Sequence, residues 1–322
     1  MQRRRLAALG LALALLPTAV LSAAAVRARP IPTAPAHAWV TPALGDTAIE
    51  ACWLELARNE APASVGSAGF PDAPRWNVTV SSLLVRHPKG DLAIDVGNSS
   101  HFADEVKELP TYERTWLERL PGSNRVVEGA PAAFARAGVD LRHLRVVVTH
   151  VHADHAGGLV DLAGVPVLVA EEEAAFVHAD HGSIHVVPAH RRAMSGREAK
   201  LVFARKPYAT FDESADLFGD GSVVVVKLGG HTPGSVGVFV NLSPTLRMMH
   251  VGDAVNLREA IRKRRTKSFV MASSDVDRDA ADATVAKLAQ LHDADGALKI
   301  LPAHEREAWE EALGAPDRCV RR

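Results

Sequence analysis

The sequence predicts an α/β fold in which a mixed β-sheet system is covered by helices on its outside. Strand-like and helix-like segments alternate along the 322 residues, and several of the strands are short, continuous apolar runs. Such runs are typical of strands that are buried on both faces, as in a sheet packed between other layers. With 47% hydrophobic residues, the chain can also fill a large core.

The expected strands follow one another in order. Residues 77–87 and 91–97 are predicted to form a hairpin, because Pro88, Lys89 and Gly90 between them favour a turn. The most apolar runs are 144–150 and 165–170, and four more strand-like stretches complete the set: 221–230, 235–242, 246–253 and 297–304. Helices are expected between them, at 130–137, 158–162, 171–178 and 279–292. For the last helix, Asp277 offers a start signal.

The N-terminus has the pattern of a secretory signal peptide over residues 1–25: basic residues, an apolar run and a small-residue cleavage region. An uncleaved membrane anchor is the alternative, since the apolar character approaches the length of a membrane span. Residues 26–50 are rich in Pro and Ala and predict a linker, which leaves 51–318 as one domain. We therefore expect export to the periplasm or the exterior, with no stable membrane association if the signal is cleaved. Cys52 and Cys319 can pair in such a compartment, but the sequence does not show whether they come within reach.

The pentapeptide Val-His-Ala-Asp-His occurs twice, at 151–155 and 177–181. In the first copy, His150 and His152 leave a buried strand two residues apart, so their side chains point the same way and can chelate one ion. Asp154 continues that row, and the glycines at 157 and 158 allow a turn that brings His155 toward a second ion. The full pattern favours a metal site over a structural role.

The second copy follows a helix-like segment, has Phe176 in place of the first histidine of the pattern, and lacks the glycine pair. We expect a solvated helix end there, where a histidine suits the helix dipole. The alternative is a flap over the cleft that carries four histidines: His178, His181, His185 and His190.

Two metal ions need more ligands than the first copy provides. His231, Asp253 and His304 are the candidates, because each follows a strand-like run and lies beside Gly or Pro. Together with Asp95 in "LAIDVG", the ordered motifs "THVHADHAGG", "GGHTPGS", "HVGD" and "LPAH" resemble those of the metallo-β-lactamase-fold hydrolases. This resemblance covers roughly residues 65–313 and implies a four-layer αβ/βα sandwich with a metal centre at one edge.

The resemblance implies the ligand sets. His150, His152 and His231 match the ligands of a first zinc, and Asp154, His155 and His304 match those of a second. Asp253 matches the bridging ligand, and Asp95 the residue that supports the ligand loop. Nitrogen and oxygen donors without thiolate suit two zinc ions, although manganese or iron fits the same donors. The function implied is hydrolysis of a carbonyl ester by a metal-bridging hydroxide, with Asp154 transferring a proton.

Within this superfamily, the bridging aspartate separates the chain from the true β-lactamases, and the motif set is most similar to that of acyl-homoserine-lactone lactonases. A lactone is therefore the expected substrate, with a β-lactam, another ester or amide, or a phosphodiester as alternatives. The lactonases commonly carry a tyrosine a few residues after the bridging aspartate. Here the polar residue is Asn256, which can donate a hydrogen bond to an oxyanion but cannot act as a general acid.

Substrate contacts are expected from Tyr208 and from Arg258 and Arg262 of a basic segment, whose alternative role is a solvated helical face. The expected partner is a small-molecule substrate. A formal net charge of −1 and few aromatic residues argue against nucleic acid. A non-catalytic binding protein of the same fold would normally lack one or more ligands, and here none is missing. The sequence does not specify the oligomeric state.

Overall fold

The computed structural model describes residues 31–33, 40, 47–68, 75–119, 126–179 and 182–321. The expected signal segment, 1–25, and most of the expected linker lie outside these residues. Within the described part, Ile31 packs against a core cluster and Val40 forms an isolated bridge with Ala209, so two points of the lead-in contact the domain. No helix in this part is long and apolar enough to cross a bilayer.

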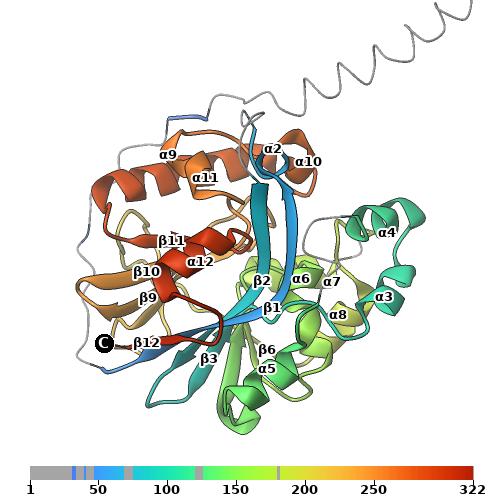
Figure 1. The fold of residues 1–322 in the computed structure, drawn as a ribbon, viewed down its shortest axis with the longest axis horizontal. Coiled ribbons are helices and arrows are strands. Elements are labelled where there is room, and N and C mark those ends of the chain that lie inside the picture. Colours follow the sequence, from blue (N-terminus) through green and yellow to red (C-terminus); the bar gives the residue numbers. More distant parts are fainter. Residues whose placement is uncertain are drawn as a thin grey trace, which may run out of the picture.

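Two β-sheets face each other in the middle of the molecule (Figure 1). The larger sheet has seven strands in the order β12-β1-β2-β3-β4-β5-β6. They are β12 (Cys319–Arg321), β1 (Glu50–Pro62), β2 (Arg75–Arg86), β3 (Asp91–Ile94), β4 (Leu144–Val147), β5 (Val167–Val169) and β6 (Glu198–Lys200). The smaller sheet has the order β11-β10-β9-β8-β7. These strands are β11 (Lys299–Leu301), β10 (Leu246–His250), β9 (Val236–Ser243), β8 (Val223–Lys227) and β7 (Ala215–Asp216).

Helices cover the outer face of each sheet. Beside the larger sheet lie α3 (Phe102–Glu105), η1 (Val106–Glu108), α4 (Thr111–Leu117), α5 (Ala130–Arg136), η2 (Leu141–His143), α6 (Ala153–Ala156), η3 (Gly157–Val160), α7 (Glu171–His178) and α8 (Pro188–Met194). The remaining helices are α2 (Ala63–Gly66), α9 (Arg258–Arg262), α10 (Phe269–Ala272), α11 (Arg278–Ala294) and α12 (Arg306–Leu313). Helix α11 begins as expected, because the Asp277 side chain accepts a hydrogen bond from the Ala280 amide.

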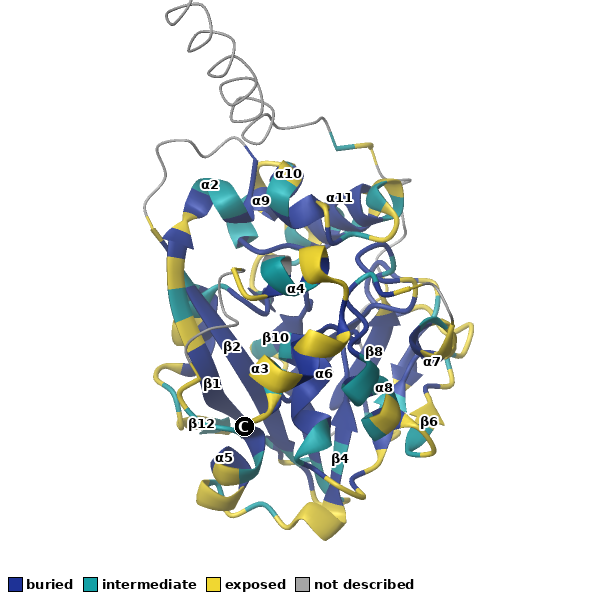
Figure 2. Cartoon of the chain, turned by 90° about the vertical axis from the view of Figure 1, so that its right-hand side faces the viewer, coloured by how far each residue is buried: buried dark blue, intermediate teal, exposed yellow. Residues whose placement is uncertain are grey.

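Buried residues line the strands of both sheets (dark blue in Figure 2). They form three large clusters that correspond to the interfaces between four layers. The central cluster joins the two sheets, with Leu83 from β2 and Val238 from β9. A second cluster packs Phe134 of α5 against the outer face of the larger sheet. A third packs Leu288 of α11 against Phe239 of the smaller sheet. The predicted αβ/βα sandwich is therefore confirmed.

All the strands expected from the sequence are present, most of them shorter than expected, and β2 and β3 form the predicted antiparallel hairpin. The sequence analysis assigned no strand to β1 or β12. A disulfide between Cys52 and Cys319 joins these two strands. The Cα atoms of the two cysteines are 4.0 Å apart. The last strand thus ends three residues beyond the expected domain end at 318, and it pairs with β1 at the edge of the larger sheet.

The topology brings the metal-site motifs to one end of the sandwich. Strands β3 and β4 are parallel, as are β10 and β11, so the residues that follow each pair emerge at a common sheet edge. Asp95 follows β3, and the 150–155 segment follows β4. Asp253 follows β10, and His304 follows β11. His231 lies in the turn between β8 and β9, which completes the set.

Candidate metal centre

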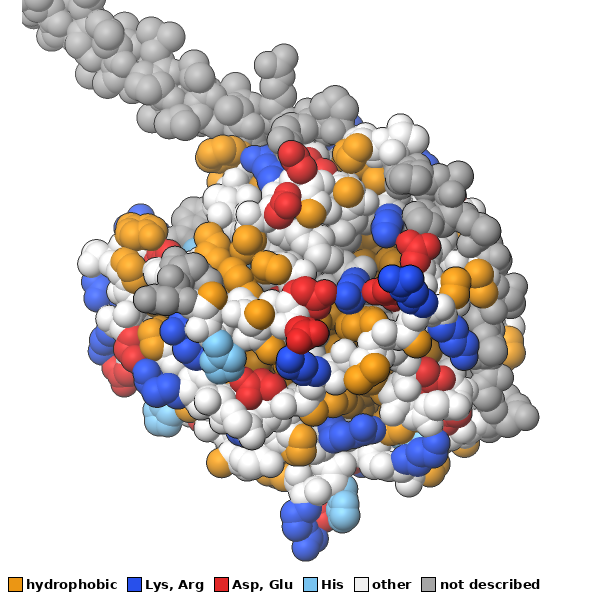
Figure 3. Space-filling view, turned by 180° about the vertical axis from the view of Figure 1, so that it is seen from behind, with side chains coloured by type: hydrophobic (Ala, Val, Ile, Leu, Met, Phe, Trp, Pro, Cys, Tyr) orange, Lys and Arg blue, Asp and Glu red, His pale blue; other side chains and the backbone are white. Residues whose placement is uncertain are grey.

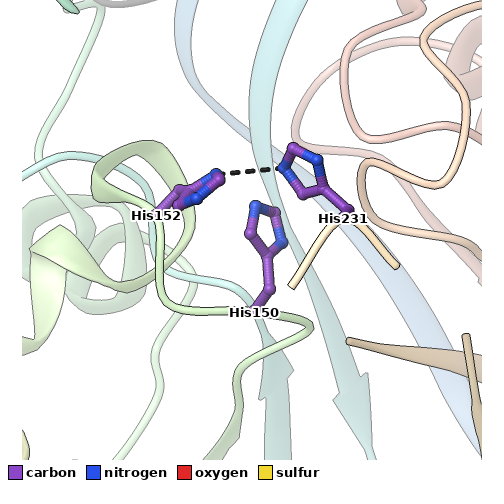
Figure 4. A group of neighbouring side chains, drawn as sticks. All are labelled: His150, His152 and His231. Atoms are coloured by element: carbon purple, nitrogen blue, oxygen red, sulfur yellow. Dashed lines mark hydrogen bonds between the residues drawn. The ribbon is translucent and has the colours of Figure 1, made fainter. Parts of the chain in front are cut away.

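Seven side chains with metal-binding atoms converge between the two sheets. Three imidazoles form one group, in which Nε2 of His231 lies 3.0 Å from Nδ1 of His152 and His150 points between them (Figure 4). Asp154, His155 and His304 form a second group, in which Nε2 of His155 lies 3.3 Å from Nε2 of His304. Within each group the ligand atoms lie within 4.8 Å of one another.

The carboxylate of Asp253 lies between the two groups. Its Oδ1 is 3.1 Å from Nε2 of His304 and 3.4 Å from Nε2 of His155, while its Oδ2 is 3.5 Å from Nε2 of His231. One carboxylate oxygen therefore faces each group, which is the arrangement required of a ligand shared by two ions. The side chain is 9% exposed, so this negative charge is almost entirely removed from water.

Burial and charge set opposite pKa shifts in the two groups. Burial lowers the pKa values of His150 and His152 well below the usual range. Burial also acts to lower the pKa values of His155 and His304, but the negative charges of nearby carboxylates outweigh it. The pKa of His155 is therefore raised well above its ordinary value, and that of His304 is raised to about 9. His155 and His304 thus share protons with carboxylates when no ion is bound, and a cation would displace these protons.

Asp95 supports the second group from below. Its carboxylate accepts hydrogen bonds from the Thr149 amide and hydroxyl at 2.7 and 2.8 Å, and its Oδ2 lies 2.7 Å from Nδ1 of His155. Since Nδ1 of His155 is held by this carboxylate, Nε2 is left facing the centre. Nδ1 of His304 has a similar partner, the Thr79 carbonyl at 2.8 Å.

Three buried residues that the sequence analysis missed support the ligands of the first group. Glu173 accepts hydrogen bonds from the Val151 amide, the Thr232 hydroxyl and the Gly234 amide, so it joins the two loops that carry the histidines. Asp275 lies 2.8 Å from Nδ1 of His231, and the Lys267 ammonium contacts the same carboxylate. For Glu173 the sequence holds a usable signal, because it follows β5 at the same sheet edge as the ligands. No spacing rule points to Lys267 or Asp275.

Two glycines allow the ligand loops to pack closely. A Cβ on Gly158 would lie 2.2 Å from the Val96 carbonyl oxygen, and one on Gly230 would lie 2.2 Å from the Ala281 amide nitrogen. The expected turn at the glycine pair is absent, because His155 belongs to helix α6 and Gly157 continues directly into η3. Gly157 and Gly158 therefore allow the backbone to pack closely against the segment that follows β3. They do not form a turn that reorients His155.

Asn256 does not take the position expected of it. Its side chain is buried and its amide donates to the Gly66 carbonyl at 3.1 Å, so it holds helix α2 in place. This bond uses one of the two N–H groups of the amide, and the residue is 1% exposed. A direct contact between Asn256 and a substrate oxygen stays a prediction, because closeness to Asp253 in sequence does not fix the direction of a side chain after a turn.

The expected substrate contacts are also misplaced. Tyr208 packs in the cluster on the outer face of the smaller sheet, where its hydroxyl accepts a hydrogen bond from Asn241. Arg258 pairs with Glu305 and Glu311, and Arg262 pairs with Glu259. Both arginines line a small pocket that contains none of the seven converging residues. Their positive charges are thus balanced locally. The solvated-face interpretation fits Arg262, whose side chain is 51% exposed, whereas Arg258 is only 17% exposed.

The second pentapeptide copy ends helix α7, as expected, and His178 is 43% exposed and paired with Glu198. His190 is buried against Glu105, and His181 lies outside the described residues. His185 agrees with the alternative interpretation in part, since its ring centroid lies 5.4 Å from that of His152. It is a buried neighbour of the centre and not a residue on an exposed flap.

The residues fit a pair of ions. Nε2 of His150 is buried at the centre without a hydrogen-bond partner among the described residues, so an ion is the natural occupant of its lone pair. The donors are imidazole nitrogens and carboxylate oxygens, which zinc prefers together with thiolate, and which manganese and iron also accept.

Comparisons with known proteins agree with this geometry. Residues 75–313 match the family model of the metallo-β-lactamase superfamily. The chain is 24% identical over 247 residues to the N-acyl homoserine lactonase AttM of Azorhizobium caulinodans, covering 75% of this chain and 87% of that protein.

Two solved structures have the same fold. One is an N-acyl homoserine lactone hydrolase with the product N-hexanoyl-L-homoserine at its metal centre (16% identity, TM-score 0.59, 82% of this chain and 96% of the other). The second is AidC, a dizinc quorum-quenching lactonase (17% identity, TM-score 0.55, 83% and 90%). The chain therefore belongs to the metallo-β-lactamase superfamily and is a metal-dependent hydrolase.

Proposed function

We propose that this hydrolase holds two zinc ions and opens carbonyl esters, with lactones as its substrates. The observation that carries the proposal is the position of Asp253, whose two carboxylate oxygens face two separate groups of ligand atoms. A single-ion site would not need a buried carboxylate shared in this way. The ligands of the first ion are His150, His152 and His231, those of the second are Asp154, His155 and His304, and Asp253 binds both.

When bound, two such ions lower the pKa of a shared water to about 7 and polarise an ester carbonyl. The chain supplies rigid ligands and a proton carrier. Asp154 is the most exposed of the seven ligand candidates, with 26% of its side chain accessible, whereas the others are at or below 9%. We assign to Asp154 the transfer of a proton from the attacking water to the leaving alkoxide.

A lactone substrate is favoured by the relatives, since AttM and AidC are named lactonases and cover most of this chain. On the face shown in Figure 3, basic and acidic side chains are interspersed and form no continuous basic surface. A small molecule is therefore the partner that we propose. The Cys52–Cys319 disulfide supports an exported protein, because such bonds persist in oxidising compartments.

The activity test is proton release at constant pH when the zinc-loaded protein meets a long-chain acyl-homoserine lactone. A kcat/KM above about 10⁴ M⁻¹s⁻¹, the lower end of ordinary enzyme efficiency, would establish the lactonase. If two zinc ions are bound and no proton is released, the lactone assignment is wrong. β-Lactams, other esters and phosphodiesters are then the substrates to try, in that order.

The di-metal assignment has its own test. Asp253→Ala removes the only carboxylate among the described residues that faces both groups, so we expect one ion per chain in place of two and nearly complete loss of hydrolysis. Metal content after gel filtration, measured by mass spectrometry, gives the ratio directly. A variant that keeps both ions would rule out the bridging role.

A further inference from the structure

The five histidine ligand candidates differ in what holds the ring nitrogen that faces away from the centre. For His155 it is the Asp95 carboxylate, for His231 the Asp275 carboxylate, for His304 the Thr79 carbonyl, and for His150 the Thr149 hydroxyl at 3.2 Å. Each of these partners fixes ring orientation and tautomer, which a metal-binding imidazole needs.

His152 is the exception. Its Nδ1 faces His231 across the centre, so Nε2 is the nitrogen that points away. This Nε2 is buried and, within the described part of the chain, has no hydrogen-bond partner. A buried N–H without an acceptor costs about 1–3 kcal/mol, so a partner is expected nearby.

The side chain next to it is His185. The two rings lie with centroids 5.4 Å apart and planes at 68°, in an edge-to-face arrangement. His185 is 6% exposed, and its Nδ1 is likewise buried without a partner among the described residues. Its other nitrogen, Nε2, lies 3.3 Å from the Ser274 hydroxyl. Two buried, unpartnered ring nitrogens therefore belong to two neighbouring rings.

The backbone around His185 is shaped to keep the ring in this place. Ser183, Ile184 and His185 all have positive φ, at 128°, 45° and 68°, which is unfavourable for residues with a side chain and most of all for the β-branched Ile184. The Ser183 hydroxyl accepts a hydrogen bond from the His185 amide at 2.8 Å. Strain of this kind persists only where surrounding structure imposes it, and it concentrates at functional sites.

We propose that His185 is the positioning residue of His152: its Nδ1 accepts, through one bridging water, the hydrogen bond that Nε2–H of His152 donates. The tautomers of both rings are consistent with this series of hydrogen bonds. When Nδ1 of His185 is the acceptor, the proton of the neutral ring is on Nε2, which donates a hydrogen bond to the Ser274 hydroxyl. One water suits two buried nitrogens of neighbouring rings that form no direct hydrogen bond, and it costs little relative to a direct contact.

This inference rests on the proposed metal centre, and the experiment separates the two. Three variants of the metal-loaded protein are compared: His185→Phe keeps a ring without nitrogen, His185→Asn restores an acceptor near Nδ1, and His178→Phe is the control from the exposed second copy. Asn also tolerates positive φ better than most residues. Zinc affinity is measured by competition with a chromophoric chelator, and the visible spectrum is recorded after cobalt substitution.

We expect His185→Phe to weaken the binding of one ion by about 10–100-fold, the usual effect of removing an outer partner, and to alter the cobalt spectrum. His185→Asn should recover at least part of the affinity, and His178→Phe should match the parent protein. If the parent protein binds two ions and His185→Phe binds them equally well with the same spectrum, the positioning role is overturned and the metal centre stands. If the parent protein does not bind two ions, the proposed centre itself fails. Should His185→Phe not fold, His185→Ala takes its place, and parent affinity with an unchanged cobalt spectrum in that variant would overturn the role.

Discussion

The same five residues occur at 151–155 and at 177–181, but the structure uses them in different ways. In the first copy, His152 and His155 are buried and face other ligand candidates. In the second, His178 ends helix α7, is 43% exposed and contacts the half-buried Glu198 of β6. The difference comes from what precedes each copy. A strand that ends at the sheet edge directs the first copy into the centre, whereas His178 of the second copy belongs to helix α7, which lies outside the larger sheet (Figure 1). A short motif therefore acquires function from the element that presents it.

The largest effect is expected from the first copy itself. His152→Ala removes a buried ligand candidate and leaves His150 and His231 as the only imidazoles of their group. We expect loss of one ion and a fall in kcat/KM larger than the 10–100-fold that is typical of outer partners. Metal content and ester hydrolysis are measured on the same preparation. Full metal content with unchanged kcat/KM would show that the first copy is no more functional than the second.

The next effect concerns the support beneath the first copy. Asp95→Asn keeps the shape of the side chain but replaces one acceptor oxygen by an NH₂ group, so it cannot accept from both Thr149 and His155. The second copy has no such support among the described residues. We expect metal affinity to fall by about 10–100-fold with the fold retained. Isothermal titration with zinc checks this, and an affinity equal to that of the parent protein would contradict the supporting role.

A third effect lies in helix α7, which contains His178 of the second copy and contacts the first copy through Glu173. Its fully buried Glu173 holds the first copy, and burial raises the pKa of this carboxyl from 4.5 to about 7. Between these values the folded chain binds a proton that the unfolded chain does not. The stability of the metal-free protein therefore falls as pH rises, by at most about 1.4 kcal/mol per pH unit from this group. Glu173→Gln should flatten that slope in urea unfolding between pH 5 and 7. Parallel slopes for the two proteins would refute the protonated state of Glu173.

These comparisons also show which parts of the site were predictable from sequence. The ligands of the first copy are close in sequence, and His231, Asp253 and His304 each follow a strand, so strand ends alone were enough to bring them together. Asp275 and Lys267 belong to the chain between α9 and α11, and only tertiary packing places them behind His231. No local period or spacing encodes such a contact.

The fold was predictable to a similar extent. Apolar runs identified the inner strands, since burial on both faces leaves a clear signal in the sequence. Strand β1 was not predicted because it contains the charged Glu55, which is buried and paired with Arg306 from α12. A partly buried ion pair across 251 positions is a long-range property, and its charged residue gives a core strand the sequence pattern of a surface segment. For the same reason the pairing of Cys52 with Cys319 required the structure.

The smallest effect is expected from the second copy. His178→Ala removes one hydrogen bond to Glu198 at a side chain that is 43% exposed, and such pairs contribute from zero to about 1 kcal/mol. We expect a change of less than about 0.5 kcal/mol in the free energy of unfolding, no loss of metal and an unchanged kcat/KM. Urea unfolding and metal analysis of His178→Ala beside His152→Ala provide the direct comparison between identical pentapeptides. If His178→Ala lost an ion, the helix that precedes the second copy would not be enough to keep it out of the metal centre, and the argument from the preceding element would fail.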